Sequence, residues 1–148
     1  MTTKDNKSLA RHFVEELFNS KGNLAATAEL LADNFIDHNP LPGLPPLPPG
    51  PAGFKQLAAI FRTAFPDLLY IIEDMIAEDD KVIIRYSACG TNTGNLVTMP
   101  PTDERVTVTG FDMFRIAGHR IVEWWHCDDY FSLLQQLGML PHLGYSGQ

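Results

Sequence analysis

Two titratable side chains, Asp129 and His38, stand where acid/base chemistry could take place. Asp129 follows a predicted strand, and alternation places it on the same face as Ile121 and Trp125. Burial beside a tryptophan in an apolar wall raises the pKa of a carboxyl group, which can then exchange a proton near neutral pH. Asp129 also precedes a predicted helix, and its spacing is equally consistent with capping that helix.

His38 follows the short extended stretch 35–37 and precedes Asn39-Pro40. Spacing alone favours a loop histidine, with Asn39 opening an Asx-turn. The functional alternative is a proton donor at the mouth of a pocket. Asp112 interrupts an otherwise apolar strand face, which indicates either a partly solvated face or a second buried polar group.

The run from His126 to Asp129 contains residue types that bind metals. Neighbouring strand residues point to opposite faces, so these side chains cannot all converge, and we expect no metal site. For Asp128, capping of the following helix is the favoured interpretation. The sequence has no GxxxxGK[ST], GxGxxG, HExxH, GxSxG or CxxC pattern, which removes the usual support for nucleotide, zinc and serine-hydrolase sites.

Helical periodicity dominates the first part of the chain and strand alternation the second. We predict helices over 8–19, 24–31 and 53–65, and an extended stretch at 35–37. Strands are predicted over 69–77, 81–90, 105–116 and 120–127, with turns at 78–80 and 117–119, a closing helix over 130–137 and an irregular tail after Leu140. Helices followed by an antiparallel meander predict an α+β fold, a cone in which the curved sheet wraps around the helices.

A proline-rich stretch separates the predicted second and third helices. Seven of the 11 prolines lie between residues 40 and 51, which excludes a helix or a central strand there. We interpret it as a stiff loop on the rim of a pocket. The alternative is a polyproline II ligand for an SH3-type partner.

Size and charge narrow the function classes. A chain of 148 residues fits a single domain, with its core at about 8–138. The net charge of −7, without any basic run, disfavours binding of nucleic acid or of an anionic membrane. Only two cysteines, a polar N-terminus and no apolar run of about 20 residues indicate a reduced, cytoplasmic protein.

Several segments together resemble the SnoaL-like polyketide cyclases, small enzymes of the nuclear-transport-factor-2-like fold. The resemblance runs from about residue 9 to residue 138. Its segments are 35–40, 53–55, 64–67, 90–94, 100–102, 106–115 and 121–123, followed by Trp125, Asp129 and 133–138. The sequence departs from the family pattern at Asn92 and Trp124, where many relatives have histidine, and in the length of the proline loop.

The resemblance implies an enzyme that closes a ring by intramolecular aldol condensation of an apolar polyketide ester, without a metal or an organic cofactor. It implies a homodimer or homotetramer packed through the sheet. The family's acid/base aspartate falls on Asp129 and its pocket histidine on His38. The expected substrate-binding residues are Phe35, Phe54, Phe61, Phe65, Asn92, Met113, Trp125 and Leu134.

The resulting hypothesis is that Asp129 removes a carbon-bound proton while His38 hydrogen-bonds the oxygen on which charge develops. Three alternatives stay open. The same pocket could catalyse another acid/base reaction (isomerisation, dehydration or hydrolysis). The protein could sequester an apolar metabolite without chemistry, or it could be an interaction module that uses the proline loop.

Overall fold

A computed structural model describes residues 2–140, which fold into four α-helices and one curved five-stranded sheet. The predicted irregular tail after Leu140 lies outside these residues. The helices are α1 (Thr3–Phe13), α2 (Thr27–Leu30), α3 (Pro51–Ala64) and α4 (Tyr130–Gln136). The strands are β1 (Leu31–Asp37), β2 (Leu69–Glu78), β3 (Lys81–Thr91), β4 (Arg105–Ala117) and β5 (Arg120–Asp128). The predicted α+β class is confirmed.

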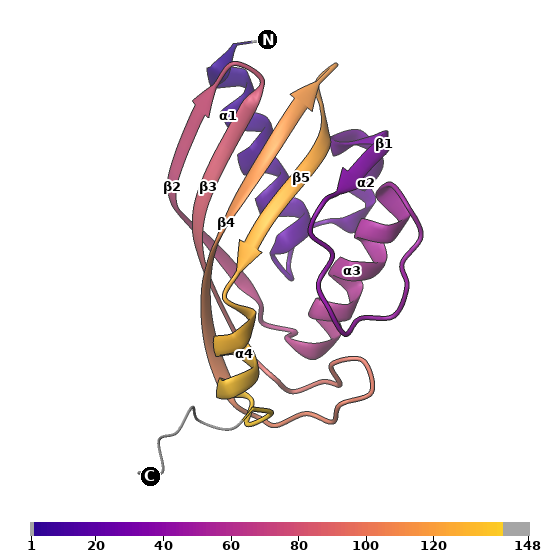
Figure 1. The fold of residues 1–148 in the computed structure, drawn as a ribbon, viewed down its shortest axis with the longest axis vertical. Helices are drawn as coiled ribbons and strands as arrows, with labels where there is room; N and C mark the ends of the chain where they lie inside the picture. Colours follow the sequence, from indigo (N-terminus) through magenta and orange to yellow (C-terminus); the bar gives the residue numbers. More distant parts are fainter. Residues whose placement is uncertain (1, 141–148) are drawn as a thin grey trace.

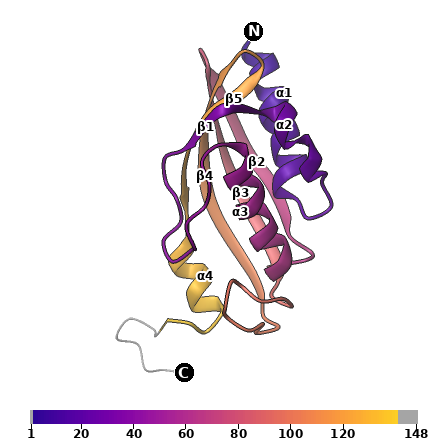
Figure 2. The ribbon, with the colours of Figure 1, turned by 90° about the vertical axis from the view of Figure 1, so that its right-hand side faces the viewer.

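The sheet has the order β1-β5-β4-β3-β2 (Figure 1). Strands β2 to β5 form an antiparallel meander, and β1 pairs in parallel with β5 at one edge. Figure 2 shows α1, α2 and α3 gathered on one face of the curved sheet, with α4 near its lower end. The inner face is therefore covered by helices, and the outer face is not. None of the helices in the described part of the chain is long and apolar enough to cross a membrane.

Helix α1 begins at Thr3, five residues before the predicted start at residue 8, because Thr2 caps it. The Thr2 hydroxyl accepts a hydrogen bond from the Asp5 backbone N–H, and the Asp5 carboxylate accepts one from the Thr2 N–H. This reciprocal capping box stabilises the first turn. Helix α1 continues into a π-helical turn, η1 (Val14–Phe18), which brings Phe13 and Phe18 into edge contact with ring centroids 4.9 Å apart.

The core lies between this helical layer and the inner sheet face. Phe13, Leu17, Ile84, Phe114 and Ile121 are fully buried there. Phe13 contacts both Phe54 of α3 and Phe114 of β4, with ring centroids 5.1 Å apart in each pair. These contacts fix α1, α3 and the sheet relative to one another, so the walls of any space between them are preformed.

A β-bulge in β5 decides which of its side chains face inward. Arg115 pairs with Glu123, but the next residue of β4, Ile116, pairs with Ile121, so Val122 is an extra residue. The alternation therefore changes phase after Ile121, and Trp124 and His126 are buried. The predicted phase, which placed Trp125 on the buried face with Ile121, is wrong for this reason.

Two connections close the lower part of the fold. The loop over 38–50 contains the prolines and runs beside α3 (Figure 1). The loop between β3 and β4 is held by Asn92, whose Nδ2 donates to the carbonyls of Ala64 and Gly94. Its Oδ1 accepts hydrogen bonds from the backbone and hydroxyl of Thr102. This amide is fully buried and joins the loop to the end of α3.

Candidate active site

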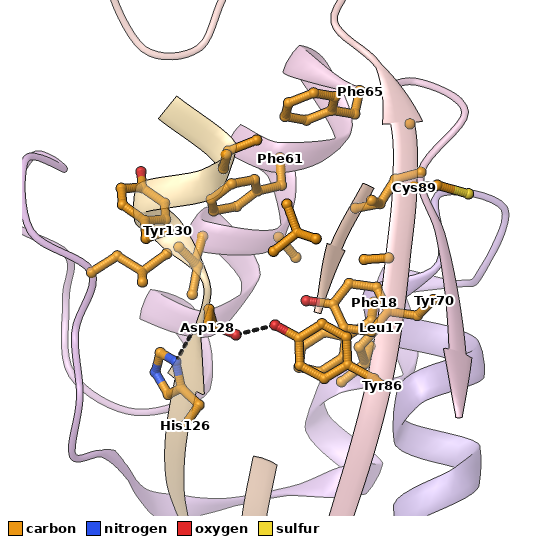
Figure 3. A pocket seen from close by; sticks show the side chains of 18 of the residues that line it. Leu17, Phe18, Phe61, Phe65, Tyr70, Tyr86, Cys89, His126, Asp128 and Tyr130 are labelled. Atoms are coloured by element: carbon orange, nitrogen blue, oxygen red, sulfur yellow. Dashed lines mark hydrogen bonds and ion pairs between the residues drawn. The ribbon is translucent and has the colours of Figure 1, made fainter. Parts of the chain in front are cut away.

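A pocket lies between the inner face of the sheet and helices α3 and α4 (Figure 3). Its volume is about 100 Å³. Most of its wall is apolar. The lining also includes the polar side chains of Tyr70, Tyr86, His126 and Asp128 from the strands and of Tyr130 from α4. The apolar lining includes Leu17, Phe18, Leu41, Phe54, Leu57, Phe61, Phe65, Val106, Val108, Trp124 and Leu133.

The sheet register brings Tyr86 and Asp128 together. Tyr86 of β3 pairs with Gly110 of β4, and Gly110 pairs with Asp128 of β5, so the three form one row across the sheet. Because Gly110 has no side chain, the Tyr86 ring lies over it and its hydroxyl donates a short hydrogen bond to Asp128 Oδ1 (Figure 3). A Cβ atom at Gly110 would lie 2.5 Å from the Tyr86 oxygen. The glycine is thus required for this contact.

His126 lies between two carboxylates. Its Nδ1 lies 2.6 Å from Asp128 Oδ2, and its Nε2 lies 2.8 Å from Asp37 Oδ1, which comes from β1. Burial alone would lower the pKa of His126, but the hydrogen bonds to Asp128 and Asp37 outweigh it and raise the pKa to about 9. At neutral pH the ring is therefore an imidazolium that donates to both carboxylates.

The imidazolium ring stacks on Trp124 at a centroid distance of 3.8 Å. The Trp124 indole N–H donates to Asp112 Oδ1 at 2.9 Å, so the carboxyl group of Asp112 fixes the orientation of the tryptophan ring. Burial raises the pKa of Asp112 to about 7, although the Trp124 hydrogen bond opposes the increase. The sequence left open whether Asp112 lies on a partly solvated face or is a buried polar group. The structure shows that it is buried.

The tyrosine pair extends the polar row into the apolar part of the pocket. Tyr70 of β2 stacks on Tyr86 with ring centroids 4.6 Å apart. Burial raises the pKa of both phenols far above the usual value, and the nearby carboxylates add to the effect. Both hydroxyls are therefore neutral hydrogen-bond donors at physiological pH.

Of the predicted site residues, Phe54, Phe61 and Phe65 line this pocket. Asp129 does not. It is exposed, its Oδ1 accepts from the Ser132 backbone N–H at 3.1 Å, and it is the N-cap of α4. The expectation that Asp129 lies on the buried face is wrong because of the Val122 bulge, and capping, the other interpretation of its spacing, describes its geometry. Leu134 is half-buried outside the pocket, and its neighbour Leu133 lines the wall.

The other predicted site residues lie elsewhere. His38 stacks on Trp125 with ring centroids 4.6 Å apart, and its Nε2 lies 2.9 Å from Glu123 Oε1. Trp125 pairs with Met113 across β4 and β5, on the face opposite His126 and Asp112. His38 and Asp129 therefore do not face one cavity. Phe35 is buried against Trp124, and Asn92 supports a loop.

Sequence reasoning missed Asp37, Tyr86, Trp124, His126 and Asp128 as a connected group. These residues lie far apart in the sequence. The face that each β5 side chain occupies depends on the bulge at Val122, and the neighbouring apolar residues Ile121-Val122 and Trp124-Trp125 do not reveal where that bulge lies. One signal was present: Gly110 stands in the middle of a predicted strand, and glycine there often marks the close approach of another group.

This arrangement can move a proton. Asp128 presents a carboxylate to an apolar space, Tyr86 supplies a neutral donor beside it, and His126 supplies a positive charge within hydrogen-bond distance of that carboxylate. Both nitrogens of His126 are occupied by carboxylates. Among the described residues no cluster of histidine, cysteine and acidic side chains is arranged to hold a metal ion.

Comparison with known proteins agrees with the fold. The family described as SnoaL-like polyketide cyclase matches residues 8–137. The nogalonic acid methyl ester cyclase of Streptomyces nogalater is 32% identical over 90 residues, which cover 60% of this chain and 67% of that protein.

Solved structures share the whole architecture. IdmH of Streptomyces antibioticus has a TM-score of 0.73 at 29% identity, covering 90% of this chain and 98% of its own. TsrD of Streptomyces laurentii has a TM-score of 0.81 at 23% identity, covering 95% and 99%, which supports the fold alone. The match over most of its length, together with the cone of helices and sheet around an apolar pocket, places this chain in the SnoaL-like polyketide cyclase family.

Proposed function

We propose that this protein closes a ring in an apolar polyketide ester by intramolecular aldol condensation, with Asp128 as the acid/base residue. The observation that carries the proposal is the Asp128 carboxylate, which faces a mostly apolar pocket and is hydrogen-bonded to Tyr86 and His126. The similarity to the nogalonic acid methyl ester cyclase of Streptomyces nogalater supports an ester substrate, and the match to the SnoaL-like polyketide cyclase family supports a polyketide.

The reaction begins with a proton transfer. Asp128 takes the proton from a substrate carbon flanked by carbonyl groups, and the electron pair of that C–H bond moves onto a carbonyl oxygen to form an enolate. Protonation of Asp128 weakens its hold on the Tyr86 hydroxyl, which can then donate to the enolate oxygen. The enolate carbon attacks a second carbonyl of the same molecule, and the new alkoxide takes the proton back from Asp128. This proton transfer returns Asp128 to its starting form.

The remaining side chains act by position and charge. His126, as an imidazolium between Asp37 and Asp128, places a positive charge beside Asp128 and fixes the direction of its oxygens. The aromatic walls, including Phe54, Phe61 and Phe65, exclude water and hold the flexible chain bent. Preorganising two ends of one molecule can supply about 7–11 kcal/mol of the barrier reduction in favourable cases.

Paired isosteric variants test the assignment. Asp128→Asn removes the base without changing its volume, and we expect kcat for a polyketide methyl ester to fall by about 10²–10⁴-fold. Asp129→Asn is the matched control on the adjacent residue, and we expect a rate close to that of the wild type because asparagine also caps helices. Equal turnover by wild type and Asp128→Asn would reject the assignment.

Solvent exchange separates the enzyme from a binding protein. The wild type should catalyse exchange of the acidic substrate hydrogen for deuterium in D₂O, measured by NMR of the substrate, and Asp128→Asn should not. Tight binding of the polyketide ester without exchange or ring closure by the wild type would instead favour a protein that sequesters an apolar metabolite.

A further inference from the structure

Tyr70 lines the pocket but takes no part in the steps proposed above. In an aldol condensation two oxygens gain negative charge in turn, first that of the enolate and then that of the carbonyl that the enolate attacks. Asp128 and Tyr86 serve the first oxygen. A donor placed for the second oxygen would lower the barrier to forming the carbon–carbon bond.

The Tyr70 ring is fixed before a substrate enters. Tyr70 of β2 pairs with Ala88 of β3, two residues beyond Tyr86, so the two tyrosines lie diagonally on one face of the sheet. The Tyr70 ring stacks on Tyr86 and also contacts Phe18, with ring centroids 4.6 Å apart in each pair. Its backbone N–H donates to Asn19 Oδ1 at 2.6 Å. The hydroxyl therefore has a set position, as a catalytic donor requires.

The protons of the two phenols are not equally available. Each phenol has one proton to donate, and Tyr86 donates its proton to the Asp128 carboxylate. The Tyr70 hydroxyl is hydrogen-bonded to Tyr86, so Tyr70 must be the donor between them. Burial, with smaller contributions from Asp112 and Asp128, raises the pKa of Tyr70 well above its usual value. Tyr70 thus keeps its proton and shares it with a neutral oxygen.

A substrate carbonyl can take the place of that neutral oxygen. Hydrogen bonds between neutral groups are weaker than the bond that joins Tyr86 to a carboxylate. Tyr86 is 1% exposed, whereas Tyr70 is half-buried. Figure 3 shows the oxygens of both tyrosines directed into the pocket, on the side that faces Asp128. In the resting enzyme, Tyr70 is therefore the phenol of this pair that can bind a neutral carbonyl.

We propose that Tyr70 is a second catalytic donor, which binds the oxygen of the carbonyl that the enolate attacks. This inference rests on the proposed function. As the new carbon–carbon bond forms, the π-electron pair of the carbonyl moves onto its oxygen, and the Tyr70 hydroxyl stabilises the resulting alkoxide without giving up its proton. The alkoxide then takes the proton held by Asp128. The two oxygens end as those of a β-hydroxy ketone, close enough together for the neighbouring donors Tyr86 and Tyr70.

Binding of a carbonyl can be tested without turnover. The probe is acetophenone with an isotope label in its carbonyl group, whose stretching frequency falls when the oxygen accepts a hydrogen bond. In isotope-edited infrared spectra of the full-length protein, we expect wild type and Tyr86→Phe to show the bound carbonyl at low frequency. Tyr70→Phe should return it to the higher frequency of an apolar solvent. Equal frequencies in wild type and Tyr70→Phe would overturn the assignment.

Deuterium exchange separates catalysis by Tyr70 from a structural role. With a polyketide methyl ester in D₂O, Tyr70→Phe should still exchange the acidic hydrogen at the wild-type rate, because Asp128 and Tyr86 form the enolate. Its ring closure should slow about 10²–10³-fold, the usual effect of removing one oxyanion donor, so that recovered substrate carries deuterium. Tyr86→Phe, the same change on the stacked ring, should slow both steps. Loss of both steps in Tyr70→Phe would indicate structural damage and contradict the proposal.

The result is separable from that of the proposed function. A wild type that binds acetophenone through Tyr70 but neither exchanges hydrogen nor closes a ring would reject the cyclisation and keep Tyr70 as a carbonyl-binding residue. Equal rates of ring closure in wild type and Tyr70→Phe would reject the role of Tyr70 and leave the proposed function intact.

Discussion

At the scale of single residues, Gly110 is the position on which the polar row of the site depends. A methyl group there would meet the Tyr86 oxygen at 2.5 Å and the Cys127 carbonyl oxygen at 2.8 Å, too close for either atom to remain in place. We expect Gly110→Ala to displace the Tyr86 ring, to separate it from Asp128 and to cost about 1–3 kcal/mol of unfolding free energy. Urea unfolding and the cyclisation rate measure both effects.

Tyr86→Phe is the control for this variant, because it removes the same hydrogen bond without crowding the sheet. We expect Tyr86→Phe to lose activity with a smaller loss of stability than Gly110→Ala. If Gly110→Ala unfolded at the same urea concentration as the wild type, the close packing of Tyr86 over Gly110 would be contradicted.

The buried titratable residues make stability depend on pH with a defined sign. Burial raises the pKa of Asp112 to about 7, so its stabilising contribution is complete below the unfolded value of 3.8 and is lost as the pH rises through 7. His126 behaves in the same direction: despite burial, its carboxylate partners raise its pKa from 6.5 to about 9, and its contribution is lost as the pH rises through 9.

The wild type should therefore lose several kcal/mol of unfolding free energy between mildly acidic and alkaline pH, since one unit of pKa is worth about 1.4 kcal/mol. Asp112→Asn still offers an oxygen to the Trp124 N–H and cannot ionise. We expect it to flatten the dependence below about pH 7, near the Asp112 pKa, and to leave the loss around pH 9. Urea titrations across this range measure the slopes, and an unchanged slope below pH 7 would contradict the ionisation of Asp112.

At the scale of elements, local sequence signals were sufficient for the type and order of the helices and strands. The predicted strand 81–90 corresponds to β3 (Lys81–Thr91), and 105–116 corresponds to β4 (Arg105–Ala117), because alternation and flanking turns are local properties. The turn at 117–119 has Gly118 and His119 at positive φ, as a tight hairpin requires. Helix α1 differed because its cap lies at Thr2.

The candidate site was only partly predictable, because its polar residues are brought together by register. Phe54, Phe61 and Phe65 follow helical spacing, so their common face could be predicted from the sequence. The phase of β5 is set by the pairing of Ile116 with Ile121 and of Arg115 with Glu123, which is a tertiary property. A one-residue change of phase exchanged Asp129 for Asp128 and placed His126 in the pocket.

At the scale of the whole molecule, the outer face of the sheet carries apolar side chains that no helix covers. Ile76 of β2, Ile83 of β3 and Phe111 of β4 are 65%, 41% and 54% exposed, and the register pairs Ile76 with Ile83 and Ile83 with Met113. The half-buried Met113 and Trp125 continue this surface toward β5. Contiguous exposed apolar surface on a folded domain often marks an interface.

We propose that this outer face packs against a second copy of the chain. A stable contact of this kind typically buries about 800 Å² per partner. Phe111 lies on the central strand, so Phe111→Asp should place a charge inside the interface and convert the assembly to monomers in sedimentation-velocity experiments. Phe131→Asp is the matched control, since Phe131 is 47% exposed on α4 and lies off the sheet. A monomeric wild type, or a dimer that survives Phe111→Asp, would rule out this interface. Cyclisation by the monomeric variant would then tell whether the site is complete within one chain, as the position of all its polar residues on one sheet leads us to expect.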